Sequence, residues 1–137
     1  MKFFTKTISV TTQAPFDFVV IDNQINQGIR ESKIKKGFVL LRSPHNTATV
    51  ICNENDPTVL EDIEGNLKRL FPDNFPWAHK DEGLDNARAH QVVSLFGHTH
   101  WVPVEKGKLK LGTWQSIFLL ELFEGRQRRV EAIVVGE

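Results

Sequence analysis

The sequence has almost no cysteine. Cys52 is the single cysteine among 137 residues, so no disulfide can form within the chain, and the paired cysteines of zinc knuckles are missing. A chain with so little cysteine fits a reducing compartment, and we expect the protein in the cytoplasm.

The chain also lacks an excess of either charge and any long apolar run. With 17 basic and 17 acidic residues the formal net charge is zero, which argues against a protein whose main partner is nucleic acid or an anionic membrane surface. No segment approaches the roughly 20 apolar residues of a membrane-spanning helix. The apolar run within Met1–Lys6 is too short for a signal peptide. We therefore expect a soluble protein with no nucleic-acid and no membrane partner.

The chain does have the length of one ordinary domain. At 137 residues about two-thirds of the surface of the unfolded chain can be buried, which is enough for a hydrophobic core. The sequence contains no internal repeat and no linker. A single domain covering residues 1–137 is expected.

The first half of the chain predicts strands around one helix. Asp22 is expected to cap a helix that carries Ile25 and Ile29 on one face. The strands are expected at 6–12, 18–21, 38–41 and 47–52. The run at 38–41 is apolar throughout, as in a central strand that is covered on both sides.

The second half predicts two more helices and then only strands. Asp56 followed by Pro57 is a strong helix start, and Pro72 ends that helix. The next helix is expected between Asp85 as its cap and Gly97. Strands follow at 101–104, 109–111, 114–122 and 128–135, with a turn at 105–107. This order predicts an α+β fold, a single domain with a large mixed, mostly antiparallel β-sheet or sandwich and about three helices.

Four of the five histidines fall between Trp77 and Trp101, and imidazole is the commonest metal ligand. His45, His79 and His90 as neutral imidazoles would supply a three-nitrogen set with a fourth position open for water or substrate. Their spacing matches no local metal motif, so such a site has to be assembled in three dimensions. The alternative is that they are structural histidines.

Two other polar sets accompany these histidines. Asn86 precedes His90 by one helical turn, so the two side chains are expected to address one ligand. His98 and His100 share one face of a predicted strand and could extend a metal site, but a polar strand edge is the preferred interpretation.

Glu54 and the motif around Trp114 are candidates of a different kind. The strand 47–52 is roughly 20 Å long, which places Glu54 at the opposite end from His45 unless a partner subunit supplies one of them. Trp114 and Gln115 follow a glycine, and a glycine, an aromatic ring and a neutral amide are typical of a small-molecule pocket.

Three arginines near the carboxy terminus are the candidates for binding phosphate. Guanidinium groups bind phosphate through paired hydrogen bonds, so Arg126, Arg128 and Arg129 suit this role. Alternation along a strand places Arg126 and Arg128 on one face and Arg129 on the other. The alternative is a solvated face of the last strand.

Several motifs, taken in order, resemble those of the YjbQ family. They stand here as His45–Ala48, Asn53–Asp56, His79, Asn86–His90, Val102–Val104 and Leu111–Gln115. The match covers nearly the whole chain, and the last motif is highly specific. The resemblance implies an α+β mixed-sheet fold, a homotrimer or dimer of trimers, and an activity similar to thiamine-phosphate synthesis. It also favours His45, His79 and His90 as ligands.

The chain departs from the family pattern in a few places. Asn46 replaces the usual threonine, Arg88 replaces an acid, and the hairpin 121–126 only partly follows the family motif. An arginine in place of an acid near His90 changes the local charge by about two units. We expect this change to lower the affinity of the site for a cation and to raise it for an anion.

Two functions from different classes follow. The first is a metal-assisted enzyme acting on a phosphorylated small molecule with a divalent ion, zinc or magnesium. Its catalytic residues would be His45, His79, His90 and Glu54, and its substrate-binding residues Asn86, Thr47, Trp114, Gln115 and Arg126. The second is a non-catalytic trimeric module that binds a phosphorylated metabolite, since no nucleophile is paired with a base in the sequence. Single-stranded nucleic-acid binding on Trp101 and Trp114 is disfavoured by the zero net charge.

Overall fold

The computed structural model describes residues 1–137 as strands and three helices. The strands are β1 (Lys2–Thr11), β2 (Asp17–Val20), β3 (Lys36–Arg42), β4 (Ala48–Glu54), β5 (Thr99–Glu105), β6 (Lys108–Leu109), β7 (Gln115–Glu121) and β8 (Gln127–Gly136). The helices are α1 (Asp22–Ser32), α2 (Pro57–Leu70) and α3 (Leu84–Phe96). None of them combines the length and the apolarity that crossing a membrane requires.

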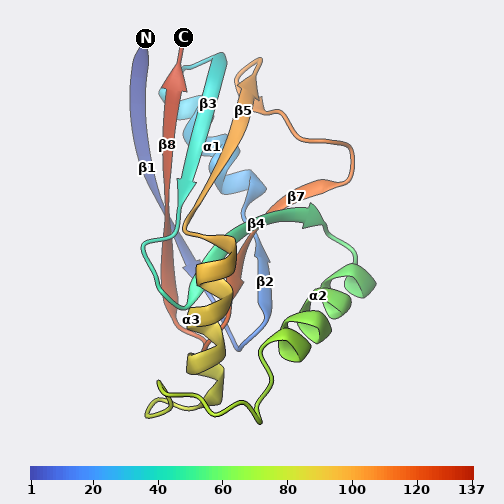
Figure 1. Cartoon of the computed structure of the whole chain (residues 1–137). Helices are drawn as coiled ribbons and strands as arrows, with labels where there is room; N and C mark the ends of the chain where they lie inside the picture. The colour runs from blue at the N-terminus through green and yellow to red at the C-terminus, as the bar shows by residue number, and fades with distance from the viewer.

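The strands form two sheets (Figure 1). A five-stranded sheet has the order β1-β8-β3-β5-β6, and a three-stranded sheet has the order β2-β7-β4. Every pair of neighbouring strands is antiparallel. The predicted α+β class is therefore confirmed. The prediction of a mostly antiparallel sheet or sandwich with about three helices is confirmed as well, and the strands are more uniform than expected, because no pair is parallel.

The main hydrophobic core lies between the two sheets. Val39 of β3 and Val130 of β8 belong to the same buried cluster as Ile117 and Leu119 of β7. Helix α1 adds side chains to this cluster, including the predicted Ile25, which is fully buried. The sequence spacing of that helix therefore identified its buried face correctly.

A second core covers the other face of the three-stranded sheet. Phe118 and Leu120 of β7 pack there with Leu67 of α2 and with Ala89 and Val92 of α3. Both helices lie at the end of the sandwich away from the two termini (Figure 1). Strand β7 is thus buried on both faces and holds the helices that carry the candidate site.

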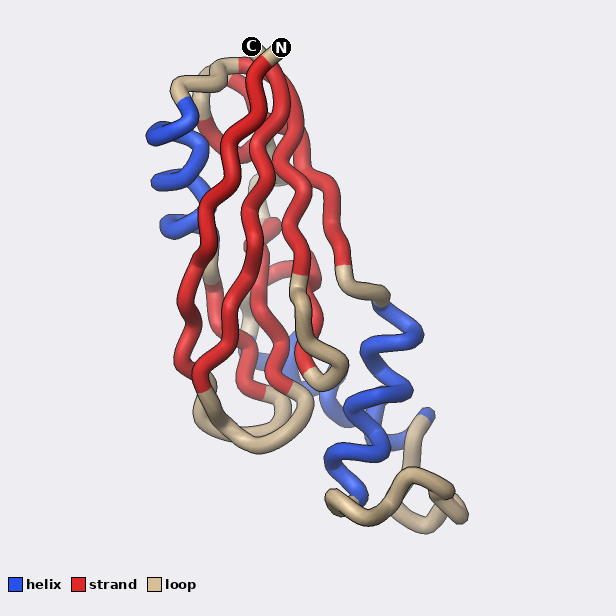
Figure 2. Tube along the Cα trace, turned by 90° about the vertical axis from the view of Figure 1, so that its left-hand side faces the viewer, coloured by secondary structure: helices blue, strands red, loops and turns tan.

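Strand β3 is central, as predicted, but it is covered on one face only. Val39 and Leu41 are fully buried, whereas Phe38 is 53% exposed. Figure 2 shows the outer face of the five-stranded sheet with no helix in front of it. The prediction of cover on both sides is therefore wrong within a single chain, because an apolar run does not reveal whether the chain itself supplies both layers.

The helices lie where the sequence predicts them, and Gly97 ends α3 as expected, but only one of the three predicted capping side chains makes its cap. Asp56 caps α2 as predicted, because its Oδ1 accepts from the N–H groups of Thr58 at 2.8 Å and Val59 at 3.3 Å. Asp22 does not cap α1, since its carboxylate accepts instead from the N–H of Ile117 at 2.6 Å. Asp85 lies in the first turn of α3 and makes no cap either.

Candidate functional site

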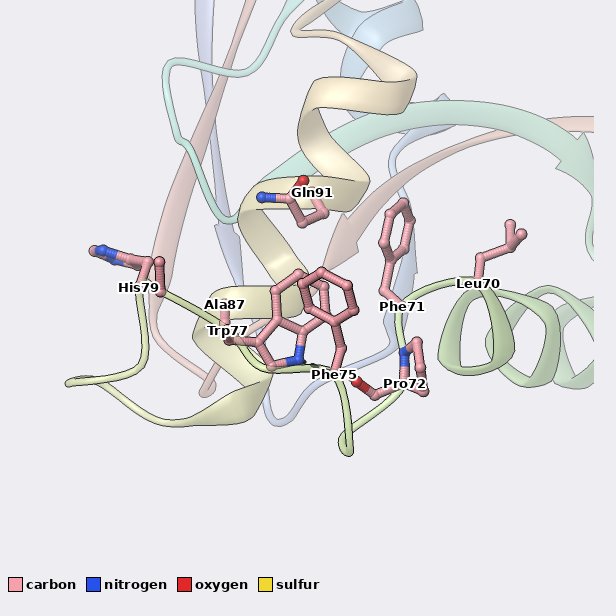
Figure 3. Close-up of a pocket in the computed structure, with 9 residues that line it drawn as sticks. Leu70, Phe71, Pro72, Phe75, Trp77, His79, Ala87 and Gln91 are labelled. Atoms are coloured by element: carbon pink, nitrogen blue, oxygen red, sulfur yellow. Dashed lines mark hydrogen bonds between the residues drawn. The ribbon is translucent and has the colours of Figure 1, made fainter.

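A cavity of about 450 Å³ opens between α3 and the loop that joins it to α2 (Figure 3). Phe75 and Trp77 lie side by side in its wall, with ring centroids 4.6 Å apart. The indole N–H of Trp77 donates to the carbonyl of Pro72 at 3.0 Å, which fixes the loop on itself. His79 lies at one edge, and Gln91 of α3 adds an amide. The cavity is therefore mostly apolar, with a few polar groups at its border.

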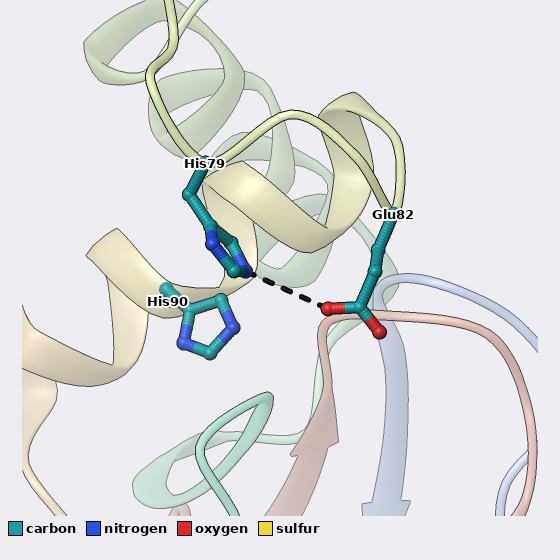
Figure 4. A group of neighbouring side chains, drawn as sticks. All are labelled: His79, Glu82 and His90. Carbon is teal, nitrogen blue, oxygen red and sulfur yellow. Dashed lines mark ion pairs between the residues drawn. The ribbon is translucent and has the colours of Figure 1, made fainter.

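Beside this cavity, His79, Glu82 and His90 form a compact group (Figure 4). One donor atom from each residue lies within 4.8 Å of the other two. His79 Nε2 is 3.5 Å from a Glu82 carboxylate oxygen, and the two imidazole rings are 4.9 Å apart in an edge-to-face arrangement. The loop supplies His79 and Glu82, and α3 supplies His90. Two nitrogens and one carboxylate oxygen at this separation can close around a single metal ion.

Asn86 lies one turn before His90 on α3, as predicted, but much deeper. Its side chain is buried, with only 3% exposed, and its Oδ1 has no hydrogen-bond partner. A buried acceptor without a partner is unfavourable by about 1–3 kcal/mol and calls for an explanation. A hydrogen-bond donor on a bound molecule, or a bound water next to Asn86, would satisfy this oxygen.

Arg88 faces away from the histidine group. Residues two apart on a helix do not share a face, so Arg88 and His90 point in different directions. The Arg88 guanidinium is buried, forms ion pairs with Asp73 and Asp85, and donates from Nε to the carbonyl of Phe71 at 2.9 Å. The effect of Arg88 on cation affinity stays a prediction, and its pairing with Asp73 and Asp85 argues against it. Arg88 ties the loop after α2 to α3.

Arg88→Met should therefore affect stability rather than metal affinity. We expect the free energy of unfolding to fall by about 1.5–3 kcal/mol, because hydrogen bonds from a charged, buried donor are lost. Urea denaturation measures this change, and calorimetric titration with Zn²⁺ should show an unaltered dissociation constant. An affinity gain of about tenfold or more would show that the charge of Arg88 acts on the site after all.

His45 does not join the group of His79 and His90. Its Nε2 accepts from the backbone N–H of Arg129 on β8 at 3.1 Å. Burial, together with the neighbouring charge of Arg128, holds the pKa of His45 below its usual range. The predicted convergence of three histidines is therefore not found in the single chain, and Glu82 stands where His45 was expected. Sequence reasoning missed Glu82, because it lies in the loop before α3, where no periodicity indicates which side chains converge.

Glu54, Trp114 and Gln115 lie together at the far end of β4. Glu54 pairs in register with Gln115, whereas the other end of β4 pairs with Glu121. The predicted separation of Glu54 from His45 is thus confirmed. Gln115 Oε1 accepts from the N–H of Gly112 at 2.8 Å, and Trp114 is 73% exposed.

Gln115 also lines a separate cleft of about 290 Å³, together with Cys52 and His100. Burial lowers the pKa of His100 and raises that of the Cys52 thiol. His98 is exposed and lies 3.3 Å from the side chain of Asn46, so it does not extend the group of His79 and His90.

Thr47, Arg126 and Arg128 have structural partners, whereas Arg129 is exposed and contributes its backbone N–H to His45. Thr47 Oγ1 accepts from Arg128 Nη2 at 2.8 Å, and Arg128 forms a buried ion pair with Glu121. Arg126 is exposed and pairs with Glu124 at 2.7 Å. Arg126 precedes β8, so strand alternation does not apply to it, and its predicted common face with Arg128 is wrong.

Comparisons with known proteins agree with each other. A family model described as UPF0047 protein YjbQ-like matches residues 6–137. The UPF0047 protein YjbQ of Escherichia coli O157:H7 is 35% identical over 136 residues, covering 98% of this chain and 99% of that protein. Among solved structures, a YbjQ-like protein of unknown function from Sulfolobus solfataricus P2 has a TM-score of 0.90 at 35% identity, with 99% of both chains covered. A hypothetical protein from Aeropyrum pernix K1 has a TM-score of 0.87 at 29% identity, with full coverage of both chains.

Proposed function

This chain belongs to the UPF0047 protein YjbQ-like family, and we propose that it is a metal-assisted enzyme acting on a phosphorylated small molecule. The observation that carries the proposal is the group of His79, Glu82 and His90 at the edge of an apolar cavity. Metal donors at the mouth of a cavity suit a ligand with a charged phosphate outside and an uncharged ring inside.

The donor chemistry favours zinc over magnesium. Two imidazole nitrogens and one carboxylate oxygen match the ligands that zinc takes in catalytic sites, where a fourth position stays open. Magnesium prefers oxygen ligands in octahedral geometry, which this set does not offer. The unpartnered Oδ1 of Asn86 supplies a further acceptor on the same helix. When bound, the ion would neutralise negative charge on a phosphate or diphosphate.

Phosphate binding in this cavity should depend on the metal. No lysine or arginine lines the cavity, and Arg88 is engaged with Asp73 and Asp85. The positive charge that a phosphate needs would therefore come from the ion. The phenyl and indole rings of Phe75 and Trp77 would hold an aromatic ring by stacking.

The resemblance to secondary thiamine-phosphate synthases specifies the reaction class further. In such a reaction the ring nitrogen of a thiazole phosphate attacks the methylene carbon of a pyrimidine diphosphate. A carbon–nitrogen bond forms, the bond from carbon to the diphosphate oxygen breaks, and diphosphate leaves with the bonding electrons. The chain's own contribution would be to stack the rings, exclude water and orient the phosphate. The same resemblance supports a homotrimer, or a dimer of trimers, in the cytoplasm.

The metal content of the purified protein and its turnover test this function. We expect elemental analysis by inductively coupled plasma mass spectrometry to find about one zinc per chain. We also expect the protein to form thiamine phosphate from the thiazole phosphate and the pyrimidine diphosphate. Removal of zinc with a chelator should abolish both turnover and binding of the thiazole phosphate, and added zinc should restore them. Absence of bound metal combined with unchanged turnover after chelation would rule the proposal out.

A non-catalytic module that binds a phosphorylated metabolite is the second candidate. It is favoured by the separation of the predicted catalytic residues. Glu54 and Gln115 lie at the far end of β4, away from His45, so they do not form one catalytic site in the single chain. Calorimetric titration with the phosphorylated precursors separates the two functions. Zinc-dependent binding without any turnover would favour the module, and no binding at all would exclude it.

A further inference from the structure

Two cavities adjoin β4 and β5, where each sheet has an open edge. β4 is the edge strand of the three-stranded sheet, and β6 pairs with β5 only at Val104 and Glu105. The cavities have volumes of about 260 Å³ and 290 Å³, and Cys52 of β4 and His100 of β5 line both of them. They share no residue with the cavity beside His79. The two cavities together are called the edge cleft below, and the thiol and the imidazole lie at their junction.

The two halves of the edge cleft differ in chemistry. Lys110 and Gln115 line the larger cavity. The smaller cavity has a mostly apolar wall, which consists of Val50, Ile51, Ile63 and Phe96 beside Asn53 and the two shared residues. Ordinary ligand sites have volumes of about 300–1,000 Å³, so either cavity alone is small for a ligand. A ligand that spans both cavities would have the usual size, with a polar end and an apolar end.

The free polar groups of the edge cleft are mainly hydrogen-bond donors. Gln115 Oε1 accepts from the N–H of Gly112 at 2.8 Å, which leaves the amide NH₂ group of Gln115 free to donate. Asn53 Oδ1 accepts in the same way from the N–H of Glu54 at 2.8 Å. Lys110 adds an ammonium group, and no aspartate or glutamate lines either cavity. Such a set of donors suits a ligand with an anionic group.

The ammonium group of Lys110 is available to such a ligand. Its partner is Glu105, at 3.4 Å, and both side chains are more than half exposed. Exposed ion pairs contribute little to stability, so Lys110 can exchange this partner for a ligand. Burial lowers the pKa of His100, so its neutral imidazole offers a hydrogen bond and no charge. One ammonium group among neutral donors matches a single negative charge, whereas a dianionic phosphate would bring a second charge without a partner.

We propose that the edge cleft binds a small carboxylate with an apolar tail. The carboxylate would accept hydrogen bonds from Lys110 and from the amide of Gln115 in the larger cavity. The tail would pass between Cys52 and His100 into the smaller cavity, where its burial against the apolar wall removes apolar surface from water. A thiol suits this passage, because cysteine behaves as a small apolar side chain. The site goes beyond the proposed function, since it uses neither zinc nor the group of His79.

Nuclear magnetic resonance of the full chain, labelled with nitrogen-15 and titrated with octanoate, tests the inference. We expect saturable shifts of the side-chain NH₂ signals of Asn53 and Gln115 and of the backbone N–H signals of Cys52 and His100. Acetate lacks the tail and octanol lacks the charge, so each should bind at least about tenfold more weakly than octanoate. Octyl phosphate should also bind more weakly. All titrations contain a chelator, so a failure of the zinc site cannot affect their outcome.

Substitutions at the two ends of the edge cleft separate the head group from the tail. Lys110→Met should weaken octanoate binding by about tenfold or more, because a charge-assisted hydrogen bond is lost. Lys108→Met is the matched control, since Lys108 is exposed and lines neither cavity. Phe96→Ala should weaken octanoate binding by about fivefold and leave acetate binding unchanged, because it shortens the apolar wall only. Phe96 is 43% exposed, so the variant should fold.

Several results would overturn the inference. One is the absence of saturable shifts at the four named residues, and another is equal affinity of Lys110→Met and Lys108→Met for octanoate. Tighter binding of octyl phosphate than of octanoate would show that the head group is a phosphate and not a carboxylate. Octanoate binding that persists in His90→Ala, together with loss of zinc binding in that variant, would support two independent sites.

Discussion

Arg128→Leu is expected to lower the free energy of unfolding by about 3–5 kcal/mol, because it leaves a buried carboxylate without its partner. Glu121 is 0% exposed and Arg128 5%. Arg128 donates from Nε and Nη2 to the two carboxylate oxygens of Glu121 at 2.8 Å and 2.5 Å, and Thr12 donates its hydroxyl at 2.6 Å. Urea denaturation at neutral pH and fixed protein concentration measures the loss.

Arg126→Leu is the matched control for this variant. Arg126 also pairs with a glutamate, at 2.7 Å, but both side chains are substantially exposed. Exposed ion pairs contribute about 0–1 kcal/mol, so the control should change stability only slightly. Equal losses in the two variants would contradict the expectation that burial makes the Glu121–Arg128 ion pair more important for stability than the exposed one.

At acidic pH the free energies of unfolding of Arg128→Leu and of the wild type should differ less than at neutral pH. Burial alone would raise the pKa of Glu121, but the hydrogen bonds from Arg128 and Thr12 outweigh it and hold the pKa below its ordinary value. A lowered carboxyl pKa stabilises the fold above the unfolded value of about 4.3, and this stabilisation is lost as pH falls through the folded value. In the variant, Arg128 no longer lowers the pKa of Glu121, and burial of this carboxyl favours its neutral form. The destabilisation measured at pH 4 should thus be smaller than at pH 7.

The fold was predictable wherever a local signal and the tertiary packing agree. Asp56 and Pro57 start α2 as expected, because a cap and an N-terminal proline act within a single turn. Asp22 does not cap α1, because a long-range contact replaces the local one. Its carboxylate is taken by the N–H of Ile117, a residue 95 positions away, and no local pattern reveals such a partner.

The buried ion pair shows the same limit. Glu121 lay within the predicted strand 114–122 and the hairpin 121–126, and no sequence pattern singled it out as a buried charge. Its partner Arg128 was grouped with Arg126 and Arg129 as a possible phosphate binder. Pairing of β7 and β8 residues in the interior is a property of the two-sheet packing, so sequence periodicity could not separate Arg128 from its neighbours.

Of the candidate site, the sequence identified two of the three grouped residues, His79 and His90. Helical spacing placed His90 on α3, and His79 was singled out because four of the five histidines fall between Trp77 and Trp101. The third member was predicted as His45, which lies against Arg129. The choice between His45 and Glu82 depends on where two loops meet in space, which neither spacing nor composition determines.

The most direct test of the site is a set of substitutions that shows whether His45 or Glu82 is the third metal ligand. His90→Ala should weaken Zn²⁺ binding by more than about 100-fold, since loss of an outer partner alone weakens metal affinity by 10–100-fold. Glu82→Ala should also weaken it strongly, whereas His45→Ala should leave the dissociation constant nearly unchanged. His98→Ala is the histidine control, because His98 contacts Asn46 rather than the group.

Calorimetric titration with Zn²⁺ at neutral pH measures all four variants. His79, Glu82 and His90 already have donor atoms within 4.8 Å of one another, so little rearrangement is needed to bind one ion. The reverse ranking, in which His45→Ala weakens binding and Glu82→Ala does not, would mean that the loop moves to bring His45 to the metal. In that case the three-histidine set expected from the sequence is the correct one, and the cost of breaking the His45 hydrogen bond to Arg129 is part of metal binding.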